Sequence, residues 1–481
     1  MNNRIHHVFW AILLVGLLLR AVVGSHSLGI VHPDEHQQYL EAANRVAYGQ
    51  GVMFWEYERG VRHYMYPYLL ASSLHVLDFV GVTQTIVQAQ VIRCCLGFAV
   101  LGSLAMLAHR WLRQGRTTAA FSLLSLSCFT PYFLFIGART LSETAAIPVL
   151  VAMIYFLDQR SVLAGLLGGL IFGIRFQMAL FVAPLFFALL LFPTNKTNQS
   201  TIRSSLRFMG GVAIGLLSVG AIDYLTWGSW FHSPIAYFEA NILEGVAASF
   251  GVSPWYYYFE PLYETVMGTS ILLVPLAIFG AIYQPRLAFA AFGFFAAHSM
   301  VGHKEARFIW PLAPVALILI STGIDQFVKA SKVSMLKSFA LISMLLVFMI
   351  PAHDSSIWRF SYHFCDYEAN SRAIAWVGNQ LDAKGLAVHG NLVDTGNCFY
   401  LRQPIPYVVQ TKWKLIEESR EWRERKLNYV IAKQKPELDV ELTPLASFDD
   451  WTVFRAESIG STDSIRALDT AGTASRDDSR S

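Results

Sequence analysis

The sequence predicts an α-helical membrane protein with many membrane-spanning helices, followed by a small α/β domain. Of its 481 residues, 54% are hydrophobic and only 15% are charged, whereas soluble domains contain about a quarter charged residues. The long apolar runs end near residue 351, and the sequence from 352 onward has an ordinary soluble composition. We therefore expect a membrane domain over 1–351, a soluble domain over 352–460 and a disordered tail over 461–481.

About eleven apolar segments are long enough to cross a hydrocarbon core of roughly 30 Å, the shortest of them only where neighbouring helices shelter them. The start of the chain resembles a signal peptide, but its weak cleavage pattern favours an uncleaved first span. The short apolar stretch 66–81 contains His75 and Asp78 and is expected to be a re-entrant or interfacial helix. The expected spans are 8–24, 86–109, 118–137, 142–157, 161–174, 177–192, 208–226, 267–283, 286–302, 306–323 and 335–351.

The basic residues predict how these spans are oriented, because Lys and Arg concentrate in cytoplasmic loops. If Met1 is cytoplasmic, an odd number of spans places the soluble domain outside the cytoplasm, together with the large loops 25–85 and 227–266. The cytoplasmic segments then contain Arg4, Arg110, Arg113, Arg116, Arg160, Lys196, Arg203, Arg207, Arg286, Lys329, Lys332 and Lys337.

Ionisable and aromatic residues gather in the outer loops, whereas a channel or carrier would place polar groups at mid-membrane. In the first outer loop, Asp34 and Glu35 follow His32 and Pro33. A proline and carboxylates suit the first turn of a helix, and the apolar spacing after them predicts an amphipathic helix on the membrane surface. The carboxylates therefore either perform chemistry at this face or simply stabilise the start of the helix.

Other outer residues suit an anionic lipid head group. Arg175 lies alone between two apolar runs, and its planar guanidinium is a natural partner for phosphate, although it could simply snorkel to the interface. The turn His303–Arg307 places several ionisable side chains in a very short connection. Glu305 could simply neutralise Lys304 or Arg307 there, or the cations could bind a phosphate. The aromatic residues could stack on sugar or pack on lipid.

Several of these segments together resemble the glycosyltransferase family 22 mannosyltransferases, over roughly residues 30–315. The chain departs from that pattern at Phe54, Tyr57, Glu143 and Phe250, where Thr, Trp, Asn and Tyr are usual. The resemblance is carried by His32-Pro33-Asp34-Glu35, Trp55-Glu56 with Arg62, Arg139-Thr140-Leu141-Ser142, Asp223-Tyr224, Ser253-Pro254-Trp255 with Tyr258, and His303-Lys304-Glu305 with Arg307-Phe308.

This resemblance implies a GT-C fold and a polyprenyl-phosphate mannose donor, dolichyl in eukaryotes. It implies transfer with inversion to a hydroxyl of a glycan or glycolipid acceptor, without a metal or another cofactor. Asp34 would be the general base, with Glu35 as the alternative. The residues expected to bind the donor phosphate or the substrates are His32, Trp55, Glu56, Arg62, Arg139, Glu143, Arg175, Asp223, Tyr224, Trp255, Tyr258, His303, Lys304 and Arg307.

Two other functions stay open, a GT-C transferase for a different lipid-phosphate sugar and a lipid or sugar transporter. The net charge of +3 gives no argument for nucleic acid as a partner. The tail beyond 352 does not resemble eukaryotic members of the family, which favours a bacterial inner membrane over the endoplasmic reticulum membrane.

The soluble domain alternates short buried strands with helices, which is typical of a small α/β domain. Strands are expected at 386–389 and 429–432, and helices at 368–381 and 412–426. Cys365 and Cys398 could form a disulfide if this domain faces an oxidising compartment.

Overall fold

The chain forms two compact units, Met1–Asp366 and Tyr367–Ser481. The computed structural model describes residues 3–26, 29–193, 198–260, 270–331, 368–390, 398–424, 426–436, 438 and 440–456. The predicted boundary near 351, the last predicted span 335–351, Cys365 and the tail 461–481 lie outside these ranges.

The first unit is helical, and its long helices coincide with the first ten predicted spans. Four are long and apolar enough to cross a membrane by themselves, Asn3–His26, Thr85–Arg113, Gln199–Trp227 and Ala306–Ala330. The total number of crossings stays a prediction. The helices are α1 Asn3–His26, α5 Thr85–Arg113, α6 Thr117–Phe129, α7 Pro131–Ile136, α8 Ser142–Phe156, α9 Ser161–Ile174, η2 Phe176–Met178, α10 Ala179–Leu191, α11 Asn198–Trp227, α15 Ser270–Tyr283, α16 Pro285–Met300, η4 Ala306–Leu312 and α17 Ala313–Ala330.

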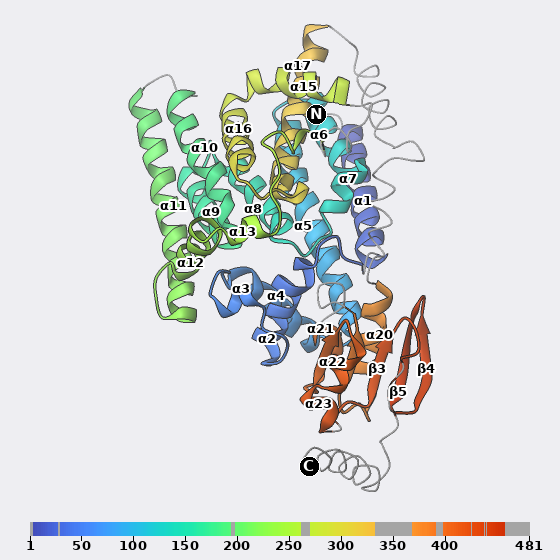
Figure 1. Ribbon diagram of the computed structural model, residues 1–481. Coiled ribbons are helices and arrows are strands. Elements are labelled where there is room, and N and C mark those ends of the chain that lie inside the picture. The colour runs from blue at the N-terminus through green and yellow to red at the C-terminus, as the bar shows by residue number, and fades with distance from the viewer. Residues whose placement is uncertain are drawn as a thin grey trace, which may run out of the picture. The chain divides into compact units, whose positions relative to one another are not determined.

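The long helices pack as a bundle (Figure 1), with α1 against α5 and α6, α10 against α16, and α15 against α17. Helices α9 and α11 pack closely, because glycines face each other across their interface. A Cβ atom at Gly169 would lie only 2.7 Å from the Cα atom of Gly215. Small residues allow two helix backbones to pack closely, as is common in membranes.

Short helices form the outer loops. Figure 1 shows α2 (Glu41–Tyr48), α3 (Trp55–Glu58) and α4 (Met65–Phe79) gathered at one end of the bundle. The π-helix η1 (Glu35–Leu40) leads into α2, and α12 (His232–Phe238), η3 (Glu239–Leu243) and α13 (Val246–Ser249) follow α11.

The helix after Asp34 is more buried than an amphipathic surface helix would be, because polar residues such as Glu41 and Asn44 are buried with its apolar ones. Its place relative to the membrane stays a prediction. The two buried polar groups bind the following loop. Glu41 Oε1 accepts a hydrogen bond from the Val52 amide at 2.6 Å, and Asn44 Nδ2 donates to the Gln50 carbonyl at 2.8 Å.

The second unit contains a five-stranded sheet of order β2-β1-β3-β5-β4. Strand β1 (Leu386–His389) pairs in parallel with β2 (Tyr407–Gln410) and β3 (Tyr429–Ala432), while β5 (Trp451–Ala456) pairs antiparallel with β3 and β4 (Leu442–Phe448). Strands β1 and β3 confirm the predicted ranges. The helices are α20 Glu368–Gly378, α21 Cys398–Leu401, α22 Trp413–Glu417 and α23 Arg420–Arg423.

Candidate active site

Four segments that are distant in the sequence meet in the first unit. They are the turn 32–35 before η1, the turn 139–143 at the start of α8, the break at Arg175 between α9 and η2, and the turn 303–307 leading into α17. Each lies at a helix end, where backbone groups lack helical hydrogen bonds and side chains can converge.

The Asp34 carboxylate is bound on both oxygens by basic side chains. Oδ2 accepts a hydrogen bond of 2.7 Å from Arg307 Nη2, and Oδ1 lies 3.4 Å from His32 Nδ1. Burial by itself would raise the pKa of Asp34, but the Arg307 guanidinium and the hydrogen bond with His32 hold that pKa well below its usual range. Asp34 is therefore ionised, as a general base must be.

The Glu143 carboxylate joins two guanidinium groups. Its Oε1 atom lies 3.0 Å from Arg175 Nη1 and 3.3 Å from Arg307 Nη1. Ser142 Oγ donates to Glu143 Oε2 at 3.2 Å and accepts a hydrogen bond of 2.8 Å from the Tyr39 hydroxyl. This buried network holds both arginines in fixed positions, with Arg307 beside Asp34.

A narrow cavity opens beside this network. Several buried polar atoms that line it have no hydrogen-bond partner among the described residues. They are Arg62 Nε, Arg175 Nε and Nη2, and the Tyr66 hydroxyl. Buried polar groups are almost always satisfied, so these donors suit an anionic ligand. The cavity must widen to admit one, because its volume of about 20 Å³ holds about one water. The lining comprises Tyr39, Tyr57, Arg62, His63, Tyr66, Ser142, Gly173, Ile174, Arg175, Phe176 and Gln177.

Glu35 and Arg139 lie in a different environment from Asp34. The Glu35 carboxylate is fully buried and lies 3.5 Å from Arg139 Nη1 and 3.8 Å from Arg93 Nη2. It also accepts a hydrogen bond of 2.9 Å from the Val31 amide. Arg139 Nη1 donates in addition to the Gly29 carbonyl at 2.9 Å. Both residues thus join the first outer loop to the bundle, and neither lines the cavity.

The first outer loop contributes Arg62 to the cavity, whereas Trp55 and Glu56 are not among the residues that line it. Glu56 accepts a hydrogen bond of 2.9 Å from Gln38 Nε2, and burial raises the pKa of its carboxyl. The Arg62 guanidinium lies 5.8 Å from the centre of the Tyr237 ring.

The second outer loop has a buried anchor and exposed aromatic rings. Asp223 is fully buried and accepts hydrogen bonds from the Ser233 amide at 2.8 Å and hydroxyl at 2.7 Å, so it fixes the start of α12. Tyr224 and Trp255 are exposed, at 51% and 67%. Tyr258 is buried, its hydroxyl has no partner in the described part of the chain, and burial raises its pKa.

The basic residues of the turn 303–307 bind two different parts of the structure. Arg307 faces Asp34, whereas Lys304 Nζ donates to the Ser253 carbonyl at 2.8 Å and His303 Nδ1 lies 3.0 Å from the Gly251 carbonyl. Glu305 does bind Arg307, through Nε at 2.6 Å. Lys304 and His303 therefore hold the second outer loop.

Several residues at this site were not among the sequence candidates, including Tyr39, Tyr66, Ser142 and Glu305. Ser142 and Glu305 stand within the motifs 139–142 and 303–308, so their positions were a signal. Tyr39 and Tyr66 carried none, because a tyrosine near a membrane face is usually an interfacial residue.

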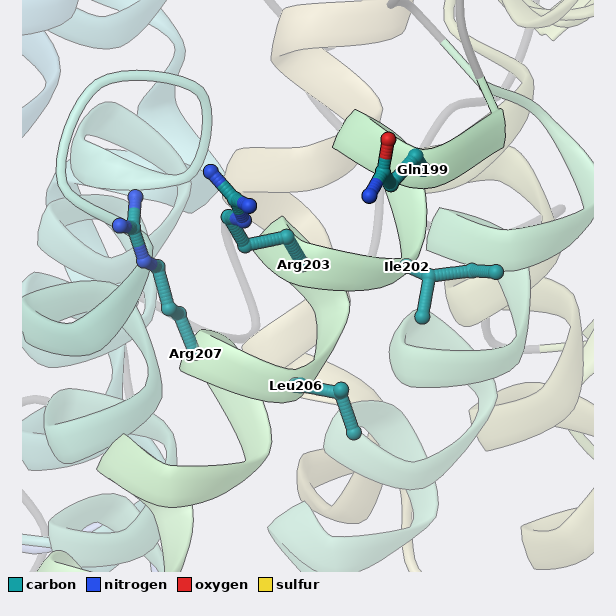
Figure 2. Close-up of a pocket in the computed structure, with 5 residues that line it drawn as sticks. All are labelled: Gln199, Ile202, Arg203, Leu206 and Arg207. Carbon is teal, nitrogen blue, oxygen red and sulfur yellow. The ribbon is translucent and has the colours of Figure 1, made fainter.

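A second hollow lies on the opposite end of α11 from Asp223 (Figure 2), and all of its lining belongs to the first turns of that helix, Gln199, Ile202, Arg203, Leu206 and Arg207. It contains no carboxylate or histidine for acid–base chemistry. Among the described residues, no group of three or more His, Cys, Asp and Glu side chains is placed to hold a metal ion.

Comparison with protein families identifies the chain. The model of the Alg9-like mannosyltransferase family matches residues 8–367. The chain belongs to this family. The match ends where the second compact unit begins, so the family's portion is the helical unit with the Asp34 cluster. Membership makes the protein a multi-pass membrane mannosyltransferase.

Named relatives carry the same activity. GPI mannosyltransferase 3 of Trypanosoma brucei brucei is 25% identical over 398 residues, which are 71% of this chain and 70% of that protein. GPI alpha-1,2-mannosyltransferase 3 of Mus musculus is 28% identical over 327 residues, 65% of this chain and 58% of that protein. These relatives are eukaryotic, so they give no support to the expected bacterial inner membrane.

A solved structure shares the fold. The crystal structure of ArnT from Cupriavidus metallidurans bound to undecaprenyl phosphate matches with a TM-score of 0.66 and 12% identity, over 96% of this chain and 100% of that one. This likeness shows the GT-C fold, as the family resemblance implied.

Proposed function

We propose that this enzyme transfers mannose from a polyprenyl-phosphate mannose donor to a hydroxyl of a glycolipid acceptor on the extracytoplasmic face. The observation that supports the proposal is the Asp34–Arg307 ion pair, which Glu143 joins to Arg175 at a cavity with unpartnered guanidinium nitrogens from Arg62 and Arg175 among the described residues. The names of the relatives favour a GPI-type acceptor and an α-1,2 linkage. They also favour the endoplasmic reticulum membrane.

The reaction is a single displacement with inversion. The acceptor oxygen attacks the anomeric carbon, its hydroxyl proton passes to Asp34, and the bond from that carbon to the phosphate oxygen breaks. The phosphate leaves with the electron pair. Arg175 and Arg62 stabilise the negative charge that develops on it, since fixed charged donors in a water-poor site stabilise such charge strongly.

Arg307 connects donor binding to the basicity of Asp34. Before the donor binds, Arg307 Nη2 neutralises Asp34 at 2.7 Å and Nη1 reaches Glu143 at 3.3 Å. Arg307 does not line the cavity, but Glu143 joins it to Arg175, which does. A phosphate bound by Arg175 would therefore compete with Glu143 and disturb the ion pair between Arg307 and Asp34. Any weakening of the ion pair raises the pKa of Asp34 toward its ordinary value, which makes it a better proton acceptor when the donor is present.

The test is a transfer assay with the purified protein in detergent. Product should form from polyprenyl-phosphate mannose with a mannose-bearing glycolipid, and Asp34→Asn should abolish it. Asp158→Asn is a matched control, because Asp158 is exposed and pairs only with Arg286 among the described residues. Activity in Asp34→Asn at the wild-type level would refute the assignment of the base.

The alternative is a GT-C transferase for another lipid-phosphate sugar, which the likeness to ArnT keeps open because it rests on fold alone. Competition between polyprenyl-phosphate mannose and the corresponding glucose and aminoarabinose lipids distinguishes the two. The proposal requires mannose to be transferred at least about tenfold faster, a difference of about 1.4 kcal/mol in activation free energy.

A further inference from the structure

Glu305 uses both carboxylate oxygens to hold three basic side chains. Oε2 lies 2.6 Å from Arg307 Nε and 3.2 Å from His32 Nε2, and Oε1 lies 3.0 Å from His303 Nε2. Arg307 and His32 are the two residues that bind the Asp34 carboxylate. Glu305 thus binds both of the residues, Arg307 and His32, that contact the proposed general base.

The same carboxylate is connected to the second outer loop through His303. The other ring nitrogen, Nδ1, lies 3.0 Å from the carbonyl of Gly251. Two further hydrogen bonds join this loop to the turn, from Lys304 Nζ to the Ser253 carbonyl at 2.8 Å and from the Ser253 amide to the Gly302 carbonyl at 3.0 Å. Gly251 has a φ of 111°, which favours glycine at this position.

We propose that Glu305 is a positioning residue that couples the seating of the loop segment 251–253 to the arrangement of His32 and Arg307 around Asp34. This inference rests on the proposed function of Asp34. Its consequence is that displacement of the loop loosens His303, then Glu305, and then both partners of the base. Entry of an acceptor past the loop would thereby change the environment of Asp34.

The charge on His32 makes the coupling measurable through the pH dependence of the activity. The groups that face this ring are Asp34, Glu305 and Arg307, and Arg62 acts on it through Asp34. Burial and Arg307 lower the pKa of His32, but the hydrogen bonds to the two carboxylates outweigh them and raise it to about 9. The Asp34 amide lies 3.2 Å from Nδ1, a contact that suits a neutral ring. We assign the imidazolium, since each ring nitrogen faces a carboxylate oxygen, Asp34 Oδ1 at 3.4 Å and Glu305 Oε2 at 3.2 Å.

The experiment compares Glu305→Gln with wild type and with Glu244→Gln. Glu244 is an exposed carboxylate of the outer-loop region that pairs with Arg59, so it matches the charge change without touching the cluster. For Glu305→Gln we expect kcat to fall at least about tenfold. The high-pH limb of the kcat/KM profile should move to lower pH by about one unit, because His32 loses one of two carboxylates. A general loss of packing would lower the rate without moving that limb.

A second readout does not depend on activity. Hydrogen–deuterium exchange of the peptide that contains the Ser253 amide should be at least about fivefold faster in Glu305→Gln than in wild type and Glu244→Gln. Unchanged exchange together with an unmoved pH limb would overturn the proposal, provided that Asp34→Asn is inactive. Retained activity in Asp34→Asn would instead refute the proposed function, while faster exchange in Glu305→Gln would still support the coupling.

Discussion

Arg175 offers the sharpest test of where the leaving phosphate binds. Its Nη1 atom is occupied by Glu143 at 3.0 Å and Ser142 at 3.3 Å, whereas Nε and Nη2 are buried at the cavity without a partner in the described part of the chain. Arg175→Lys keeps the positive charge, and its ammonium group can still reach Glu143. It cannot replace the two guanidinium nitrogens that have no other partner among the described residues.

The size of the effect follows from those two donors. A hydrogen bond to a charged group contributes about 1.5–3 kcal/mol, so the loss of two costs about 3–6 kcal/mol of transition-state stabilisation. Each 1.4 kcal/mol corresponds to about tenfold in rate, so kcat/KM for the donor should fall by about 10² to 10⁴. The lower end is expected, since the lysine charge still attracts phosphate.

The assay measures initial rates with varied polyprenyl-phosphate mannose at saturating acceptor. Arg160→Lys is the control, because Arg160 is exposed at the other end of α9 and should leave kcat/KM within about threefold of wild type. A wild-type kcat/KM in Arg175→Lys, with Arg160→Lys also normal, would show that the leaving phosphate does not depend on these nitrogens.

Two further predictions concern pH and stability. Because the pKa of His32 is raised, its stabilising charge is fully present below the ordinary value near 6.5 and is lost as pH rises through about 9. Activity and thermal stability in detergent should therefore both fall as the pH rises through about 9. A stability that rises there would contradict the charge assignment. Glu35→Gln should destabilise the fold by about 3–5 kcal/mol, because Arg139 and Arg93 would lose their shared buried carboxylate. Its midpoint of thermal unfolding should lie well below that of Asp34→Asn, and equal midpoints would refute the structural role of Glu35.

The sequence identified the main chemical groups of the site but not their individual tasks. Asp34 and Arg307, separated by 273 positions, were expected as a general base and a phosphate ligand, and the structure pairs them at 2.7 Å. The adjacent Asp34 and Glu35 could not be distinguished, because neighbouring helical residues point in different directions that depend on the packing around them. Lys304 and Arg307 were equivalent as cations until the loop carbonyls that bind Lys304 were seen.

In the soluble unit, too, only some of the elements could be predicted from the sequence. Strands β1 and β3 were predictable, since a parallel strand that is buried on both faces is a continuous run of apolar residues. Strand β4 is mostly exposed and contains Pro444, so its sequence gave no clear strand signal. The helix expected over 412–426 is two short helices, because Ser419 Oγ accepts the Trp422 amide hydrogen bond and starts a second helix.

The most direct test of the central claim is donor choice combined with removal of the base. Purified wild-type protein and Asp34→Asn would each receive polyprenyl-phosphate mannose or GDP-mannose, with the same mannose-bearing glycolipid acceptor. The account predicts product only from the lipid donor and only with the wild-type protein. Product from GDP-mannose alone, or equal product from Asp34→Asn, would contradict it.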